Sequence, residues 1–344
     1  MKSMNHRMWG SVARFLLLAV LLCGRAAGAL DTTDLKKVDL PFLPGERSVS
    51  QLVVAPDGKV YGTCIVSREQ GPRLFRYDPQ NGSLDSVGRL PDPLIQPEDL
   101  LGGAVTAWAW DPSWMRGYCL SDTGAMRFYK ADGTEQELGQ VAGTLAFAPT
   151  EYQVSKAIFF DAEGNVYTAG SGGAIYRYSP AEKKLEALGA WLPAVTGRES
   201  WASLDAAVLG PDGLVYGGTF DGYLFTFDPK TLEVVNLGKP LRQRRIQGLA
   251  FSKGKLYGIG GEDEGMPRAF AFDPKTRGFE LGGLLRADTN GTDYPPTGIM
   301  KGEQGYIYEP IGAMVTDEQG NIYIGTTGRL GNLYVWEVEQ SGQS

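Results

Sequence analysis

The stretch DGLVYGGTFDGYLFTFDP, residues 212–229, contains two short runs of alternating apolar residues, each bounded by turn residues. Such runs are typical of β-strands, in which every second side chain shares a face. The Asp-Gly pair at 212–213 predicts a tight hairpin before the first run, because glycine accepts a positive φ without steric cost. Asp-Pro at 228–229 predicts the end of the second run, because proline cannot donate to a sheet ladder. We therefore interpret this stretch as two consecutive strands of a larger unit.

The same pattern recurs along the chain. A Gly-x-aliphatic-Tyr core appears at 57–63, 163–169, 212–218, 253–259 and 319–325, with a degenerate copy at 116–122. An apolar segment precedes each copy and an alternating aromatic segment follows it, and a Leu/Val-Gly segment completes the first five copies. Four strands per repeated unit are typical of a propeller blade. We predict an all-β protein, a β-propeller of six four-stranded blades forming a single domain over residues 30–344.

The two ends of the repeat array are expected to meet. The last copy lacks its fourth strand, and the segment LKKVDLPF at 35–42 precedes the first blade. This N-terminal segment is expected to supply the missing strand, which closes the ring and removes an open sheet edge. The interval between the fifth and sixth copies is longer than the others, so a seventh, eroded blade within 284–311 is the alternative.

Residues 1–29 have the features of an export signal. Lys2, Arg7 and Arg14 precede the apolar run FLLLAVLLCG, and RAAGA supplies small residues for cleavage after Ala29. The protein is therefore expected to be secreted or periplasmic, with lipidation of Cys23 as the competing interpretation. Without the signal, 29 basic and 40 acidic residues leave a charge of −11. This charge argues against nucleic acid and membrane surfaces as partners, because both are anionic.

The mature chain has no histidine, because His6 lies in the predicted signal and is the only one in the sequence. This excludes Ser-His-Asp triads and metal sites built on histidine. Cys64 and Cys119 are the cysteines that follow the signal. A disulfide between them and two separately buried thiols are both compatible with the sequence.

The pattern DGxVYxGT…LFxFDPxT…LG, which covers most of 45–339, resembles secreted bacterial β-propellers of the NHL, SMP-30 and streptogramin-lyase type. The resemblance implies the fold and no single activity, because these families include lactonases, lyases, scaffolds and binding modules. The streptogramin-lyase type implies a histidine and a metal, and the mature chain has no histidine to supply. The SMP-30 type implies a divalent cation held by Glu, Asn and Asp in the central channel.

Propeller topology predicts where a ligand binds. It places the turns between first and second strands, and between third and fourth strands, on one face, and all other connections on the opposite face. Every long insertion belongs to the second group, so we expect this loop-rich face to bind ligands. Its arginines, carboxylates and aromatic residues suit a carbohydrate or an anionic small molecule. The candidate ligand-binding residues are Arg68, Arg198, Glu199, Trp201, Arg242, Arg244, Arg245 and Arg268.

In two short stretches the sequence indicates which residues reach the loop-rich face or the central channel. Within 212–229, Asp221 and Tyr223 are expected to reach the loop-rich face. The cluster LRQRR at 241–245 immediately precedes a predicted inner strand, so Arg245 or Gln247 is expected to point toward the central channel. An anion site is the functional interpretation of this cluster, and an ion-pair network with GEDEG at 261–265 is the alternative.

Whether the protein is an enzyme is left open. Catalysis without histidine would depend on tyrosine or lysine, and the candidates are Tyr294, Tyr306 and Tyr308, which lie in one long insertion. Glu262, Asp263 and Glu264 are candidate ligands for calcium or manganese, although no cofactor is required for binding. The leading hypothesis is an exported propeller that binds a carbohydrate or anionic small ligand. The alternatives are a polysaccharide lyase or metal-dependent hydrolase or lactonase on the same face, and a scaffold that binds protein partners.

Overall fold

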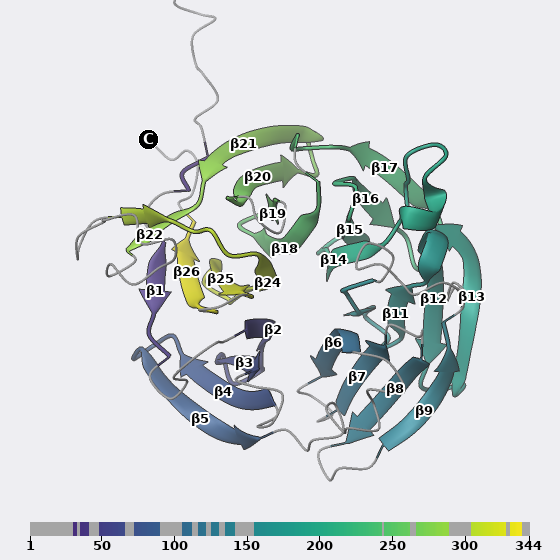
Figure 1. Ribbon diagram of the computed structural model, residues 1–344, viewed down its shortest axis with the longest axis horizontal. Coiled ribbons are helices and arrows are strands. Elements are labelled where there is room, and N and C mark those ends of the chain that lie inside the picture. Colours follow the sequence, from purple (N-terminus) through teal and green to yellow (C-terminus); the bar gives the residue numbers. More distant parts are fainter. Residues whose placement is uncertain are drawn as a thin grey trace, which may run out of the picture.

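Six four-stranded antiparallel sheets surround a central axis in the part of the chain that the structure describes (Figure 1). The structure is a computed structural model, and it describes residues 30–32, 35–40, 48–65, 72–89, 105–111, 116–121, 125–130, 135–141, 155–242, 244–261, 266–288, 304–327 and 331–338. Each sheet is one blade, and its first strand lies nearest the axis (Figure 1). The prediction of a six-bladed all-β propeller is confirmed.

The blades follow one another in chain order. Blade 1 contains β2 (Ser48–Val54), β3 (Val60–Ile65), β4 (Pro72–Asp78) and β5 (Ser83–Arg89). Blade 2 contains β6 (Val105–Asp111), β7 (Arg116–Ser121), β8 (Ala125–Lys130) and β9 (Glu135–Gln140). Blade 3 contains β10 (Phe159–Phe160), β11 (Val166–Ala169), β12 (Ala174–Ser179) and β13 (Lys184–Trp191). Blade 4 contains β14 (Leu204–Leu209), β15 (Val215–Thr219), β16 (Leu224–Phe227) and β17 (Val234–Gly238). Blade 5 contains β18 (Ile246–Ser252), β19 (Lys255–Gly260), β20 (Arg268–Asp273) and β21 (Gly278–Leu284). Blade 6 contains β24 (Ile311–Thr316), β25 (Asn321–Thr326), β26 (Leu333–Glu337) and β1 (Lys36–Val38).

The ring is closed by the N-terminal strand. β1 pairs antiparallel with β26, with Lys37 opposite Tyr334 at its centre. Leu35 and Leu40 flank β1 and are almost completely buried. The expectation that residues 35–42 supply the missing fourth strand of the last blade is therefore confirmed.

The long insertion between blades 5 and 6 contains a two-stranded sheet, β22 (Arg286–Asp288) with β23 (Gln304–Tyr306). It lies on the outer side of the ring, where Ala287 forms a bridge with Leu35 (Figure 1). The described residues of 284–311 thus form a small appendage to the closed ring and give no support to a seventh four-stranded blade.

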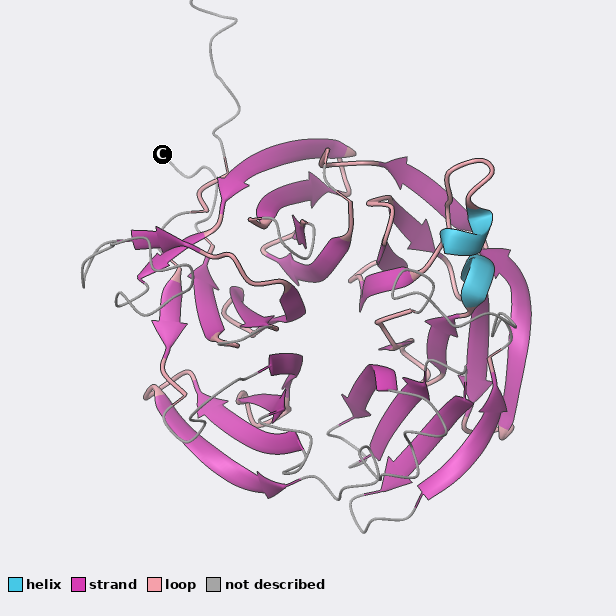
Figure 2. Ribbon diagram, in the orientation of Figure 1, coloured by secondary structure: helices cyan, strands magenta, loops and turns pink. Residues whose placement is uncertain are grey.

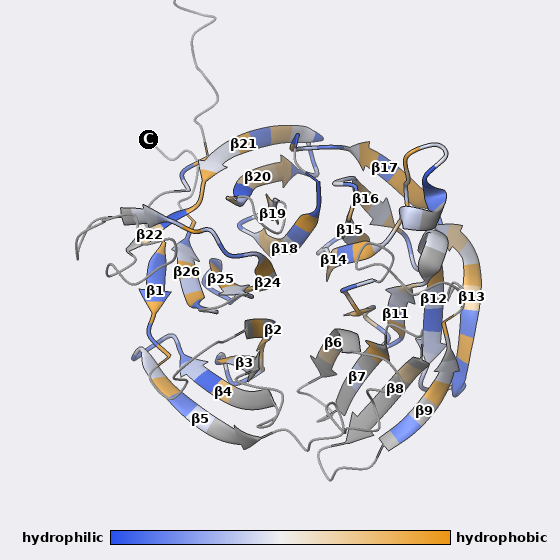
Figure 3. Cartoon of the chain, in the orientation of Figure 1, coloured by the Kyte–Doolittle hydropathy of each residue, from blue (hydrophilic) through white to orange (hydrophobic). Residues whose placement is uncertain are grey.

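The core consists of layers between neighbouring blades. Between blades 3 and 4, the ring of Tyr167 stacks on Phe159 at 5.1 Å and meets the edge of Phe227 at 5.7 Å. The second strand β15 is buried along its whole length, whereas the outermost strand β13 has exposed, half-buried and buried residues. Hydrophilic and hydrophobic residues follow one another along β13 (Figure 3). Sheet packing between blades therefore accounts for the aromatic residues of the repeat.

The repeat tyrosine has a second role at the hairpin that precedes it. The Tyr167 hydroxyl donates to Asp161 at 2.8 Å, and the Tyr323 hydroxyl donates to Asp317 at 2.9 Å. Burial, together with these bonds, raises the pKa of both hydroxyls. Burial also raises the pKa of the Tyr257 hydroxyl to about 12. These tyrosines therefore have a structural role, and their hydroxyls stay protonated at neutral pH.

The stretch 212–229 forms the two strands that its sequence predicts, β15 and β16. Gly213 has a φ of +81° in the hairpin before β15, and Asp228 and Pro229 follow β16. Cys64 lies in β3 and Cys119 in β7, on neighbouring blades, and their side chains are outside the described part.

The predicted export signal, residues 1–29, also lies outside the described residues, so export stays a prediction. Where the structure describes the chain, no helix has the length and apolar character needed to cross a membrane. Among the described residues, two short 3-10 helices, η2 (Ser171–Gly173) and η3 (Glu199–Trp201), border blade 3 (Figure 2).

Candidate functional site

The described candidate residues lie on the loop-rich face. Arg198, Glu199 and Trp201 belong to the connection from β13 to β14. Arg242, Arg244 and Arg245 belong to the connection from β17 to β18, and Arg268 is the first residue of β20. Arg68, Tyr294, Glu262, Asp263 and Glu264 lie outside the described residues, so their assignments stay predictions.

A bulge recurs where the first strand of a blade leaves the loop-rich face. The pairing of first and second strands shifts register by one residue in blades 1, 2, 4, 5 and 6. A bulge leaves one residue outside the ladder and redirects its side chain. The residues at this position are Ser50, Thr106, Asp205, Gln247 and Gly312.

Blade 3 places Lys156 at the corresponding position. Lys156 lies three residues before Phe159, which pairs with the repeat tyrosine Tyr167. Asp205 likewise lies three residues before Val208, which pairs with Tyr216. The six blades thus place six equivalent residues around the axis at one end of the channel.

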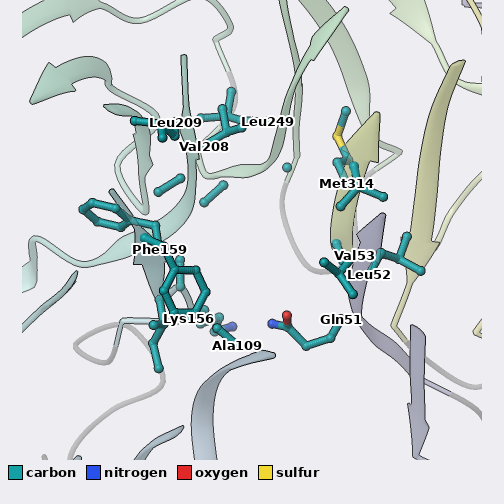
Figure 4. Close-up of a pocket in the computed structure, with 18 of the residues that line it drawn as sticks. Gln51, Leu52, Val53, Ala109, Lys156, Phe159, Val208, Leu209, Leu249 and Met314 are labelled. Carbon is teal, nitrogen blue, oxygen red and sulfur yellow. The ribbon is translucent and has the colours of Figure 1, made fainter. Parts of the chain in front are cut away.

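The channel is a cavity of about 920 Å³ that is lined by the first strands of all six blades (Figure 4). Its walls are mainly apolar and include Leu52, Val53, Phe159, Val208, Leu209, Leu249 and Met314. Its polar lining residues at the loop-rich end are Gln51, Lys156, Asp205 and Gln247, and we call this end the channel mouth. Asp161 and Glu163 line the opposite end.

A buried ion pair supports the channel mouth. The Arg245 Nε donates to Asp205 Oδ2 at 2.8 Å, and both side chains are less than a tenth exposed. Arg245 has a φ of +63°, its backbone N–H donates to the Phe220 carbonyl at 2.8 Å, and its guanidinium lies 5.6 Å from the Phe220 ring. A left-handed backbone at a non-glycine residue costs free energy, as does desolvation of two charges. The fold thus holds an arginine in a costly position, where it fixes the carboxylate of Asp205.

Gln247 lines the cavity, as expected, and is almost completely buried. Its Oε1 accepts the Ile311 backbone N–H at 3.3 Å, and its Nε2 is buried without a hydrogen-bond partner among the described residues. Lys156 is exposed, and Gln51 and Lys156 project into the cavity from opposite walls (Figure 4). The mouth therefore presents amide and ammonium donors around the Asp205 carboxylate.

A second polar cluster lies beside blade 4 on the same face. Arg198 lies over the Trp201 ring at 5.0 Å, and its Nη2 is 3.8 Å from Asp221 Oδ1. Asp221 is buried, and its Oδ2 has no hydrogen-bond partner in the described part of the chain. The Lys239 Nζ lies over the Tyr223 ring, 5.4 Å from the ring centroid. The structure thus brings Arg198, Trp201 and Asp221 together.

The remaining candidates are dispersed. Backbone N–H groups that donate to the Glu199 carboxylate, one of them from Gly197 at 2.9 Å, lower its pKa. Tyr306 lies under the Arg286 guanidinium at 5.3 Å on the outer side of the ring, whereas Arg245 borders the channel. Tyr308 is half-buried. The described partner of the Tyr306 ring is thus Arg286, and not an arginine of the LRQRR cluster.

The described ion-pair partner of Arg245 is Asp205, and the stretch 262–265 of GEDEG lies outside the described residues. In the part of the chain that is described, no group of three or more histidine, cysteine, aspartate or glutamate residues is placed to hold a metal.

Sequence reasoning missed Asp205, Lys156 and Gln51. Each lies within the apolar segment that opens a blade, where the alternating pattern hides polar residues among packing residues. For Asp205 and Lys156 the signal is positional: a polar residue second in that segment, as in LDAAVL and SKAIFF, lies at the bulge of β14 or at the equivalent position of blade 3. Gln51 lies one residue after the bulge of blade 1 and has no such signal.

No family model and no curated protein matches the sequence. Among solved structures, the chain is similar to a streptogramin B lyase with 12% identity and a TM-score of 0.51, over 88% of this chain and 97% of that chain. It is also similar to an extracellular domain described as part of a hybrid two-component system from Bacteroides thetaiotaomicron, with 15% identity and a TM-score of 0.54, over 90% of this chain. The chain spans only 40% of that domain's length. A protein of unknown function from the same organism has 13% identity and a TM-score of 0.53, over 90% of this chain and 73% of that chain.

The resemblance to secreted bacterial propellers is thereby confirmed at the level of the fold. Identities this low carry no information about activity, since one fold supports many functions.

Proposed function

We propose that the protein is an exported propeller that binds a small anionic or carbohydrate ligand at the channel mouth. The observation that carries the proposal is the convergence of Lys156, Asp205 and Gln247 at one end of an otherwise apolar cavity. Ligand sites are commonly apolar concavities of this size with a few placed polar groups.

The ion pair supports binding in particular. A buried ion pair adds little net stability compared with apolar residues of similar volume, so its presence calls for another role. Arg245 holds the Asp205 carboxylate in one orientation, which lowers the entropic cost of binding a hydroxyl or amide of a ligand. The lyase, hydrolase and scaffold hypotheses have no comparable feature in the described residues.

The test is a screen of the purified mature protein against a glycan array that includes uronates, and against small organic acids by calorimetry. We expect a ligand whose affinity falls about tenfold or more in Asp205→Asn, the effect of losing a hydrogen bond to a charged group. Arg242→Met is the matched control, because Arg242 is exposed on the same face and does not line the cavity.

Circular dichroism on each variant verifies that it is folded. If every ligand found in the screen binds Asp205→Asn as tightly as the unaltered protein, the channel mouth is not the site.

A further inference from the structure

We infer that the ligand of the channel mouth is an amphipathic carboxylate, with its anionic head at Lys156 and Gln247 and an apolar body inside the channel. This inference rests on the proposed function and narrows it to one chemical class.

The channel mouth contains a buried amide whose N–H groups are available for a ligand. The Gln247 side chain is 5% exposed, and its Oε1 is engaged by the Ile311 backbone N–H. This bond orients the amide, so that the buried Nε2 is left with N–H groups for which the described residues supply no acceptor. Buried donors are almost always satisfied, and a carboxylate oxygen supplies a charged acceptor.

The described charges at the channel mouth favour an anion. The Asp205 carboxylate is neutralised by Arg245, and Lys156 occupies the equivalent position on the neighbouring blade. Among the described residues, the charged lining residues at the mouth are therefore one paired carboxylate and one lysine, which together with Arg245 leave one positive charge. Glu309, which precedes β24 and does not line the cavity, has its carboxylate engaged by Thr326 and Asn332.

The two ends of the cavity differ in charge. Asp161 and Glu163 line the opposite end of the cavity, so that end repels an anion. An anionic head is therefore favoured at the mouth and disfavoured at the far end, which gives the ligand one orientation.

The walls of the cavity favour a ligand with an apolar body. Below the mouth the cavity is lined by Leu52, Val53, Phe159, Val208, Leu249 and Met314. A sugar ring between these walls would leave hydroxyls without partners, which costs free energy. An alkyl chain or an unsubstituted ring gains from the same contacts by leaving water.

The experiment is isothermal titration of the purified mature protein with three probes: octanoate, octan-1-ol and glucuronate. Octanol lacks the charge and glucuronate lacks the apolar body. We expect octanoate to bind about tenfold or more tightly than either, since one charged contact or one buried chain is worth at least that factor.

Three variants localise the binding. Lys156→Met and Gln247→Glu are each expected to weaken octanoate about tenfold or more, the first by removing the cation and the second by placing a carboxylate at the donor. Lys239→Met is the matched control, because Lys239 is an exposed lysine on the same face that does not line the cavity, and it should leave the affinity unchanged. Lys156 is exposed, so its replacement is not expected to affect folding.

The outcomes separate this inference from the proposed function. If octanoate and octanol bind equally tightly, or if Lys156→Met leaves the affinity for octanoate unchanged, the inference of an anionic head group at the mouth is wrong. If glucuronate binds and octanoate does not, the inference of an apolar ligand body is wrong. If Asp205→Asn then weakens the binding of glucuronate, the proposal that the channel mouth is a ligand site is still supported. Failure of all three probes overturns the inference, while the array and organic-acid screen with Asp205→Asn decides the proposed function.

Discussion

The Asp205 and Arg245 pair shows how single residues are positioned by the propeller. Asp205 lies at the bulge that opens β14, and Arg245 lies immediately before β18 on the next blade. The two residues are 40 positions apart and meet only because neighbouring blades converge on the axis. Two buried charges in such contact depend strongly on each other.

At this scale we predict that Asp205→Asn and Arg245→Met each lower the free energy of unfolding by about 3–5 kcal/mol, because each leaves one buried charge without its partner. The double variant Asp205→Asn with Arg245→Met should lose much less than the sum of the two, as measured by urea denaturation in a double-mutant cycle. Lys36 with Glu337 is the exposed control pair, and its loss should cost less than about 1 kcal/mol. If each single variant lowers the free energy of unfolding as little as loss of the control pair does, Asp205 and Arg245 do not form a buried ion pair.

Within each blade, the pairing of the second and third strands explains a glycine of the repeat. Gly62, Gly217 and Gly258 each follow the repeat tyrosine and lie directly opposite a phenylalanine of the third strand. A Cβ at Gly217 would lie 2.1 Å from Cζ of Phe225. The glycine therefore makes room for the aromatic ring rather than providing a turn.

At the scale of the element we predict that Gly217→Ala destabilises the protein by about 1–3 kcal/mol or more, because the Phe225 ring must leave its position in a close-packed layer. Guanidinium denaturation measures the effect. Gly278→Ala is the control, since the nearest atom to its added Cβ is the exposed Thr276 hydroxyl at 3.2 Å. Adding Phe225→Leu to Gly217→Ala should recover part of the loss, and the absence of any recovery would argue against the steric explanation.

In the whole molecule, the ring depends on one short strand from the other end of the chain. β1 completes blade 6, and the flanking Leu35 and Leu40 are 1% and 2% exposed. Without β1 the β26 strand becomes an open sheet edge, which invites association with another chain.

At the scale of the molecule we predict that a chain beginning at residue 41 is less stable than one beginning at residue 30 by about 4 kcal/mol or more, since loss of each buried leucine alone costs about 2–5 kcal/mol. Thermal and urea denaturation measure the difference, and sedimentation velocity should show association that depends on concentration. Equal denaturation midpoints for the two chains would show that β1 does not hold the ring together.

Much of the architecture was predictable because its determinants are local. The Asp-Gly hairpins, the Asp-Pro strand ends and the alternating runs describe each blade within a single stretch such as 212–229, and repetition supplied the blade number. The placement of Arg198 and Arg245 on the loop-rich face followed from strand order. The roles of Asp205, Lys156 and Gln51 did not follow, because a polar residue inside an apolar segment has no periodic signature.

The sequence by itself determined the blades, the strand that closes the ring and the face that carries the long loops, and it favoured six blades with a seventh within 284–311 as the alternative. The blades depend on hydrogen bonding and burial within about 50 consecutive residues, which a repeat expresses directly. The closing strand β1 pairs with β26 at the other end of the chain, and it was predictable because the last repeat lacks a fourth strand. Only the tertiary structure decided which side chains border the channel and which charges meet, such as Asp205 with Arg245. Those contacts join different blades, and they arise from the bulges and from the closure of six sheets around one axis.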